Sequence, residues 1–160
     1  MKTDTAEMTK IGGEVRAHAD VMRAVERESL EKVAELAAEM GDAIARGGKI
    51  LFFGNGGSAA DAMHMAAELT VRYKRERRAL AAIALTSDIA AITAAGNDYA
   101  FEVVFERQIE ALARPGDLAI GISTSGKSPN VVRALRAARA LGARAFAITG
   151  NQRGPILQNC

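Results

Sequence analysis

The chain has 160 residues, of which 49% are apolar and 25% are charged, and its formal net charge is +2. This composition is typical of one globular domain with a sizeable core, and the small net charge gives no reason to expect a nucleic-acid partner. No run of 18 apolar residues occurs, so no membrane span is expected. The N-terminus shows no apolar segment like that of a signal peptide, and Cys160 is the only cysteine. Both features favour a cytoplasmic protein.

The first part of the chain is predicted to be helical over residues 13–47. A break near Glu28 or Ser29 would divide this segment into two helices, and Gly47-Gly48 is a typical helix end. We therefore divide the chain into N-terminal helices, residues 1–47, and a second part, residues 48–160, within a single domain overall. The helical prediction rests on apolar residues at spacings close to multiples of 3.6, namely Val21, Val25, Val33, Leu36, Met40 and Ile44.

From residue 49 onward, short apolar runs alternate with helical patterns. The runs show no two-residue alternation, which indicates parallel strands covered on both faces. The predicted fold is therefore α/β, a doubly wound parallel sheet in a three-layer α/β/α sandwich. Strands are expected at 49–53, 81–86, 117–123 and 144–149. Helices are expected at 58–73, 89–95, 101–112 and 129–141, with an interruption at Gly96-Asn97-Asp98.

Two loops rich in glycine and serine follow the first and third predicted strands. Ligands bind at the carboxyl ends of strands in such sheets, so both loops could hold one ligand. In the first loop, residues 54–58 (GNGGS), the glycines let the backbone approach a ligand, and the next helix adds its positive dipole end. This pattern favours an anion or a polyhydroxyl group. The alternative is a plain turn in which Ser58 caps the helix.

The second loop, residues 123–128 (STSGKS), carries four hydroxyl groups at the start of a helix. Hydroxyls together with free backbone N–H groups suit a phosphate monoester. A purely structural loop would need one capping serine instead of four hydroxyls. Lys127 either adds positive charge to this site or is solvated.

The helix after the first loop carries several ionisable residues. His64 and Glu68 are one turn apart and share a face, Arg72 continues that line, and Asp61 precedes it. A histidine and a carboxylate at this spacing can bind a divalent metal such as zinc, or the carboxylate can act as a general base. The alternative is an exposed helix with an ion pair between Glu68 and Arg72. The basic run 72–78 is read as a solvated segment, and His18 as a surface residue.

Three segments together resemble the phosphoheptose isomerases, a family of sugar-isomerase (SIS) domain proteins. These are residues 54–70 (GNGGSAADAMHMAAELT), 96–99 (GNDY) and 121–132 (GISTSGKSPNVV), and the match covers nearly the whole chain to about Gly150. The resemblance implies a flavodoxin-like sandwich and a homotetramer in which the N-terminal helices make contacts between subunits. It also implies conversion of sedoheptulose 7-phosphate into D-glycero-D-manno-heptose 7-phosphate, towards the heptose of lipopolysaccharide or related glycans.

The same resemblance implies roles for particular residues. Glu68 matches the catalytic base, and His64 and Glu68 match two zinc ligands. Asp61 and Arg72 match residues that line the site, and Asn97 and Asp98 match contacts to substrate hydroxyls. The sugar would meet Asn55, Gly56, Gly57 and Ser58, and the phosphate would be held by Ser123, Thr124, Ser125 and Ser128.

The family continues past this chain's last residue with a strand and a helix whose glutamine and histidine complete the zinc site. We therefore expect an incomplete zinc site, an open sheet edge and a longer natural protein. Two other functions are possible for this fold. One is a non-catalytic binding module like the DnaA initiator-associating protein, and the other is a different SIS activity, such as a sugar-phosphate etherase or a ligand-sensing regulator. Glu68 favours the isomerase, because a binding module needs no carboxylate there.

Overall fold

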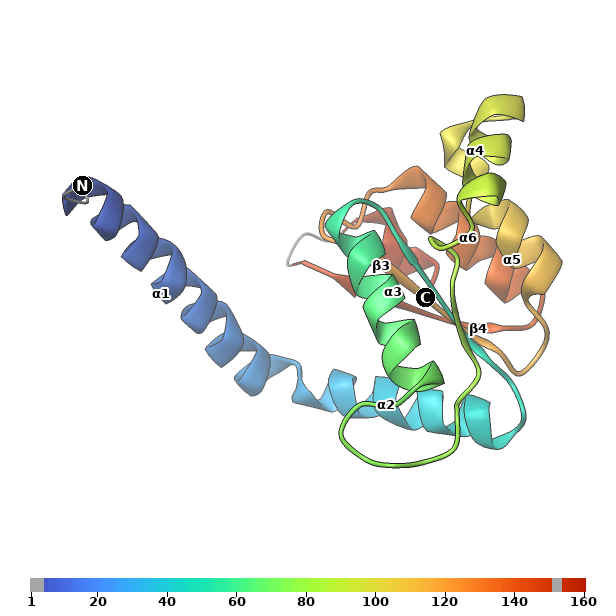
Figure 1. Cartoon of the computed structure of the whole chain (residues 1–160), viewed down its shortest axis with the longest axis horizontal. Helices are drawn as coiled ribbons and strands as arrows, with labels where there is room; N and C mark the ends of the chain where they lie inside the picture. The colour runs from blue at the N-terminus through green and yellow to red at the C-terminus, as the bar shows by residue number, and fades with distance from the viewer. Residues whose placement is uncertain (1–4, 151–153) are drawn as a thin grey trace. The chain divides into compact units, whose positions relative to one another are not determined.

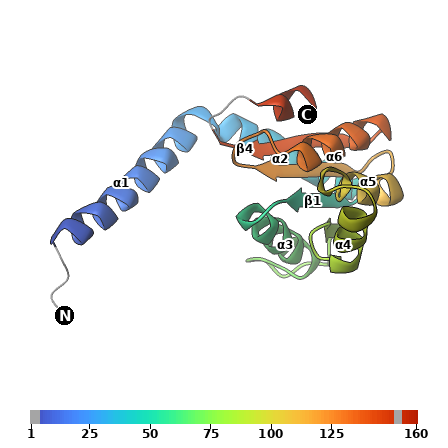
Figure 2. The same cartoon turned by 90° about the horizontal axis from the view of Figure 1, so that it is seen from above.

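A computed structural model describes residues 5–150 and 154–160, in two compact units that divide between Ala38 and Glu39. The first unit contains helix α1 (Thr5–Glu28) and the first turns of helix α2 (Leu30–Ala45). The predicted break near Ser29 is confirmed, whereas α1 begins earlier than expected. Figure 2 shows α1 as one continuous helix.

Helix α1 has no buried residue, and several of its large apolar side chains are exposed. Met8, Ile11, Val15 and Met22 are more than half exposed, and they recur at the a and d positions of a heptad repeat. His18 is also exposed, as predicted. The helix therefore carries an exposed apolar stripe.

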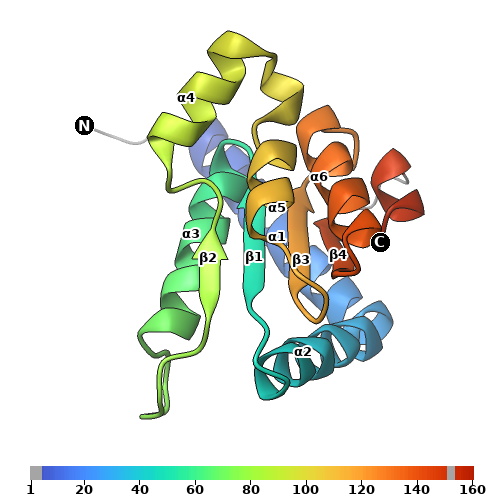
Figure 3. The same cartoon turned by 90° about the vertical axis from the view of Figure 1, so that its right-hand side faces the viewer.

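The second unit is built on a parallel four-stranded sheet in the order β2-β1-β3-β4 (Figure 3). Strand β1 is the switch point of this sheet, because the chain moves to β2 on one side of it and later to β3 on the other. The loops after β1 and β3 therefore lie at the carboxyl ends of neighbouring strands, where ligands bind in such sheets. All four predicted strands are confirmed: β1 (Ile50–Gly54), β2 (Ala82–Ala84), β3 (Leu118–Ser123) and β4 (Arg144–Thr149).

Helices cover both faces of the sheet, as predicted for a doubly wound sandwich. Figure 1 shows α3 on one face and α5 with α6 on the other, and every residue of β1 and β3 is buried. The elements that follow β1 are α3 (Gly57–Thr70), α4 (Ile89–Asp98), the 3₁₀ turn η1 (Phe101–Val103), α5 (Glu106–Leu112), α6 (Pro129–Ala140) and the 3₁₀ turn η2 (Pro155–Gln158). None of the helices in the described part of the chain has the length and apolar character needed to cross a membrane.

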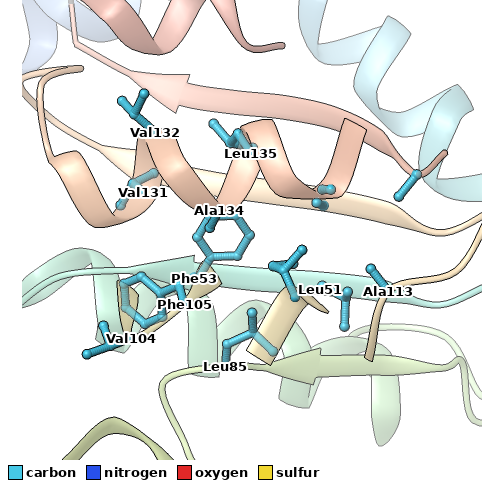
Figure 4. Packing of buried hydrophobic residues seen from close by; sticks show 14 of the residues in the cluster. Leu51, Phe53, Leu85, Val104, Phe105, Ala113, Val131, Val132, Ala134 and Leu135 are labelled. Atoms are coloured by element: carbon cyan, nitrogen blue, oxygen red, sulfur yellow. The ribbon is translucent and has the colours of Figure 1, made fainter. Parts of the chain in front are cut away.

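The main core lies between the sheet, α5 and α6. Figure 4 shows Phe53 of β1 beside Phe105, and their ring centroids are 5.6 Å apart. Gly121 of β3 lets α6 approach closely, because a Cβ there would lie 2.8 Å from the side chain of Val131. This packing fixes the start of α6, and with it the second loop, against the sheet.

Two predicted helices differ from the observed ones. The prediction of an interruption at Gly96-Asn97-Asp98 is wrong, because α4 continues through these residues and the Tyr99 N–H still donates to the Ala95 carbonyl. The predicted helix 101–112 is divided into η1 and α5 at Val104 and Phe105, whose side chains are buried in the core. In both segments tertiary packing overrides the local signals.

The helix after the first loop is also shorter than predicted. Helix α3 ends at Thr70 instead of Tyr73, and the guanidinium of Arg77 donates hydrogen bonds to the carbonyl oxygens of Glu68 and Leu69, at 2.6 and 2.8 Å. These bonds satisfy carbonyls that a longer helix would use. The expectation that Arg72 continues the face of His64 and Glu68 is therefore wrong.

Candidate active site

The first loop brings the N-terminus of α3, which has no side-chain cap, to the carboxyl end of the sheet. Gly56 is the residue before α3, with φ 56° and ψ −121°, and no side chain caps the helix. Ser58 is the second residue inside α3, so the alternative in which Ser58 caps the turn is wrong. A positive φ is open to glycine at little cost. The backbone N–H groups at this end of α3 are therefore approachable by a ligand.

Close packing holds the same loop in place. A Cβ on Gly54 would lie 2.8 Å from both the carbonyl oxygen of Ile122 and the Cβ of Ser58. Gly54 also pairs with Ile122 at the last position of the β1–β3 ladder. The start of the loop is thus held between β3 and the first turn of α3.

The second loop contains more hydroxyl groups than capping requires. Ser128 precedes α6, but its side chain makes no capping hydrogen bond. Its Oγ lies 3.0 Å from the Oγ of the buried Ser123 instead. Ser125 Oγ accepts a hydrogen bond from the N–H of Lys127, and Thr124 is exposed. This loop therefore offers hydroxyls and an N-terminus without a serine cap, an arrangement that suits a phosphate group.

Two asparagine side chains join the loops. Asn55 Nδ2 donates to Asn130 Oδ1 at 2.9 Å, and Asn130 Nδ2 donates to Asn55 Oδ1 at 2.8 Å. Asn130 lies in the first turn of α6 and is 1% exposed. The sequence reasoning identified Asn55 but missed Asn130, although it lies inside the segment that resembles the family.

His64 and Glu68 lie on one face of α3, as predicted. The distance from His64 Nε2 to Glu68 Oε1 is 3.7 Å, and the two side chains are 73% and 31% exposed. The alternative pair between Glu68 and Arg72 is wrong, because Arg72 pairs with Glu76 at 3.6 Å. The second carboxylate oxygen of Glu68, Oε2, is buried and has no hydrogen-bond partner within the described residues. Since an unpaired buried carboxylate oxygen is costly, a ligand, a proton or a cation would stabilise it.

The described residues do not complete a metal site. No group of three or more histidine, cysteine, aspartate or glutamate side chains comes together within 5–150 and 154–160. His64 and Glu68 are therefore two donors, whereas protein zinc sites use three or four. Asp61, one turn before His64 on α3, is exposed.

The remaining predicted residues lie on α4. Figure 3 shows this helix beyond the carboxyl ends of the strands. Asn97 and Asp98 are exposed there, and Asn97 Nδ2 donates to Asp98 Oδ1 at 2.8 Å. A shallow cavity of about 160 Å³ is lined by the first loop, by Thr86 and Ile92, and by the η1 segment. The first loop, α4 and η1 thus share one end of the sheet.

The fold and the two loops define a SIS-domain protein, and the SIS domain model matches residues 15–150. The phosphoheptose isomerase of Aquifex aeolicus is 52% identical over 143 residues, which are 89% of this chain and 75% of that protein. Two solved phosphoheptose isomerases have the same fold. The Neisseria gonorrhoeae enzyme, GmhA, is 41% identical with a TM-score of 0.89, and the match covers 94% of this chain and 79% of that one. The Francisella tularensis enzyme is 34% identical with a TM-score of 0.91, and the match covers 95% and 80%. The chain belongs to the phosphoheptose isomerase family.

Proposed function

We propose that this chain is an aldose–ketose isomerase that converts sedoheptulose 7-phosphate into D-glycero-D-manno-heptose 7-phosphate. The observation that carries the proposal is a hydroxyl-rich loop at the carboxyl end of the sheet in a chain whose helix α3 also carries the carboxylate of Glu68. Glu68 lies on the helix that begins at the first loop, and the second loop follows the neighbouring strand. The chain thus supplies both a loop that can hold a phosphate and a carboxylate that can act as the base.

The reaction needs a group that removes a proton from carbon. In the ketose, a base takes a proton from C1 to give an enediol, and a proton is then returned to C2. Carboxylates are common bases for such transfers. Glu68 suits this task because its Oε2 has no hydrogen-bond donor and is shielded from water. Oxygen atoms that gain charge in the enediol are stabilised by nearby hydrogen-bond donors.

The second loop would fix the substrate by its phosphate. The hydroxyls of Ser123, Thr124, Ser125 and Ser128 and the positive end of the α6 dipole all favour a dianion. The glycines of the first loop allow the sugar to lie against the backbone. Asp61, Arg72, Asn97 and Asp98 are proposed as contacts to the sugar, because they match the family's site residues.

We further propose zinc as the metal of this site, with His64 and Glu68 as two of its ligands. The unpaired Oε2 of Glu68 and the adjacent imidazole support this proposal. The other ligands would have to come from outside the described part of one chain, since no third donor is in place there. A bound zinc ion would polarise the sugar oxygens.

The oligomeric state is proposed to be a homotetramer. The exposed stripe of Met8, Ile11, Val15 and Met22 on α1 supports this proposal, because an apolar face with heptad spacing is typical of helices that pack against other helices. Other copies of this chain are the proposed partners that pack against the stripe.

We also propose that the enzyme works in the cytoplasm, on heptose for lipopolysaccharide or a related glycan. Its single cysteine agrees with a reducing compartment.

The isomerase is favoured over a non-catalytic binding module. The relatives that match over most of the chain at 41–52% identity are named as phosphoheptose isomerases. A module that binds only a protein would need neither Glu68 nor four hydroxyls in the second loop. No structural observation favours the binding module or the other SIS activities.

The direct test is turnover of sedoheptulose 7-phosphate by this chain, with added zinc and with a chelator. We expect the heptose 7-phosphate to form with zinc, and its formation to stop in the chelator. Turnover that persists in the chelator would contradict the metal but not the isomerase. No interconversion by folded protein under either condition would contradict the proposed function.

A further inference from the structure

We propose that Asn130 is a positioning residue, whose side chain sets the orientation of the Asn55 amide and the separation of the two loops. This inference rests on the proposed function and extends it. Neither the motifs nor the family resemblance assigned a role to Asn130. The observation that carries it is the pair of hydrogen bonds between two side chains 75 positions apart.

The pair lies where the sheet no longer connects the loops. The β1–β3 ladder ends at Gly54 and Ile122, and Asn55 is the next residue of the first loop. Beyond that point the chain enters α3 on one side and the serine-containing loop on the other. The amide pair therefore connects the glycine loop to the first turn of α6 beyond the last ladder pair. A substrate held at both loops would need this separation to stay constant.

Hydrogen bonding to the backbone fixes which way the amides point. Val131 N–H donates to Asn130 Oδ1 at 3.0 Å, so an oxygen, not a nitrogen, must occupy that position. Asn130 Nδ2 then faces Asn55, and Asn55 must present its oxygen to it. The orientation of Asn55 is thus dictated by a backbone group of α6.

Among the hydrogen bonds of the described residues, this orientation leaves Asn55 with one unused N–H donor. An asparagine amide has two N–H groups and one oxygen with two lone pairs. Asn130 takes one N–H of Asn55 and one of its lone pairs. The partly exposed Asn55 can therefore donate its second N–H to a sugar oxygen while the pair stays intact. A reversed amide would present an acceptor instead, and the site would lose this donor.

Burial agrees with a role beyond folding alone. Asn130 is 1% exposed, and a buried amide is costly unless it is fully hydrogen-bonded. An apolar residue would fill such a position at less risk to stability. The presence of an amide at position 130 is explained by its role in orienting the side chain of Asn55.

The experiment is a double-mutant cycle with Asn55→Ala and Asn130→Ala, in the full chain. The readouts are kcat/KM for sedoheptulose 7-phosphate, the inhibition constant of inorganic phosphate and the thermal midpoint. We expect Asn130→Ala alone to lower kcat/KM by about tenfold or more. In the Asn55→Ala background the same change should lower it by less than about threefold, because residues that act as a unit are not additive. Phosphate inhibition should change by less than about threefold in every variant, since the serine hydroxyls remain.

Asn130→Asp provides a second variant if Asn130→Ala unfolds. It keeps the size of the side chain and the oxygen that accepts from Val131, and it replaces the N–H donated to Asn55 by an oxygen of an ionisable carboxyl group. We expect the same loss of kcat/KM from it. Arg136→Ala is the matched control on α6, because this exposed side chain bonds only to Asn159, at 3.4 Å, among the hydrogen bonds found in the described residues.

Three results would overturn the inference. These are an unchanged kcat/KM in both Asn130 variants, equal losses from Asn130→Ala in the two backgrounds, and a loss of phosphate inhibition as large as the loss of kcat/KM. Lack of turnover by the unmodified chain would contradict the proposed function instead. The same cycle would then be measured as calorimetric binding of sedoheptulose 7-phosphate, which tests the coupling without turnover.

Discussion

The loops after β1 and β3 have the same position in the fold and differ in chemistry. Each follows a buried strand and leads into a helix whose preceding residue provides no side-chain cap. The first loop offers backbone groups of glycine, and the second offers the hydroxyls of Ser123, Thr124, Ser125 and Ser128. The first loop also begins the helix that carries Glu68, whereas α6 carries no carboxylate. We infer from this difference that the second loop binds the phosphate and the first loop contacts the sugar, while Glu68 on α3 acts as the base.

The substitution with the largest expected effect tests whether Glu68 is the base. Glu68→Gln keeps the size of the side chain and removes the base, so we expect kcat to fall by about 10²- to 10⁴-fold. Binding of sedoheptulose 7-phosphate, measured by calorimetry, should change little, because the phosphate loop is untouched. Glu110→Gln is the matched control, as Glu110 is exposed on α5 and pairs with Arg107. Full activity of Glu68→Gln would contradict the assignment of the base.

A smaller effect is expected at the binding end. Ser125→Ala should weaken substrate binding by about 1–3 kcal/mol, the cost of losing a hydrogen bond to a charged group. The change should appear in KM, while kcat stays close to its original value. Ser87→Ala, in an exposed turn after β2, is the control. An unchanged KM for Ser125→Ala would mean that the second loop does not hold the phosphate.

The smallest effect concerns the shape of the first loop. Gly56→Ala places a Cβ in open space, so its cost comes only from the positive φ and should be about 1–2 kcal/mol of stability. That corresponds to a thermal midpoint lower by roughly 2–8 °C for a chain of this size. Gly57→Ala is the matched comparison, since Gly57 also has open space around it and has no positive φ. It should keep or raise the midpoint, because alanine favours the helix. Equal midpoints for the two variants would show that the backbone of Gly56 is not strained by alanine.

The sequence predicted those parts of the fold that depend on local patterns. Continuous apolar runs located all four strands, and the glycine and serine residues located both loops. The predictions that were wrong concern features that depend on contacts between distant residues. Arg77 ends α3 by bonding to the carbonyl of Glu68, and no helical periodicity anticipates that. Gly96-Asn97-Asp98 has the composition of a break, yet α4 includes it.

The site was predicted unevenly for the same reason. The spacing of His64 and Glu68 is a local property of a helix, so their shared face could be foreseen. Asn130 could not, because its role depends on a partner 75 positions earlier in the chain. The alternative in which Ser58 caps the helix is wrong because α3 already begins at Gly57, and Gly56 is the residue that precedes it. Local sequence therefore indicated which groups are present, and the topology determined which of them meet.

The most direct test of the division between the loops is a crystal structure of the Glu68→Gln variant with sedoheptulose 7-phosphate. We predict that the phosphate lies within hydrogen-bonding distance of the hydroxyls of Ser123, Thr124, Ser125 and Ser128. C1 and C2 of the sugar should lie beside the side chain at position 68, from the same or a neighbouring copy of the chain. A phosphate bound instead at the N-terminus of α3, with the reacting carbons away from position 68, would contradict the division of roles.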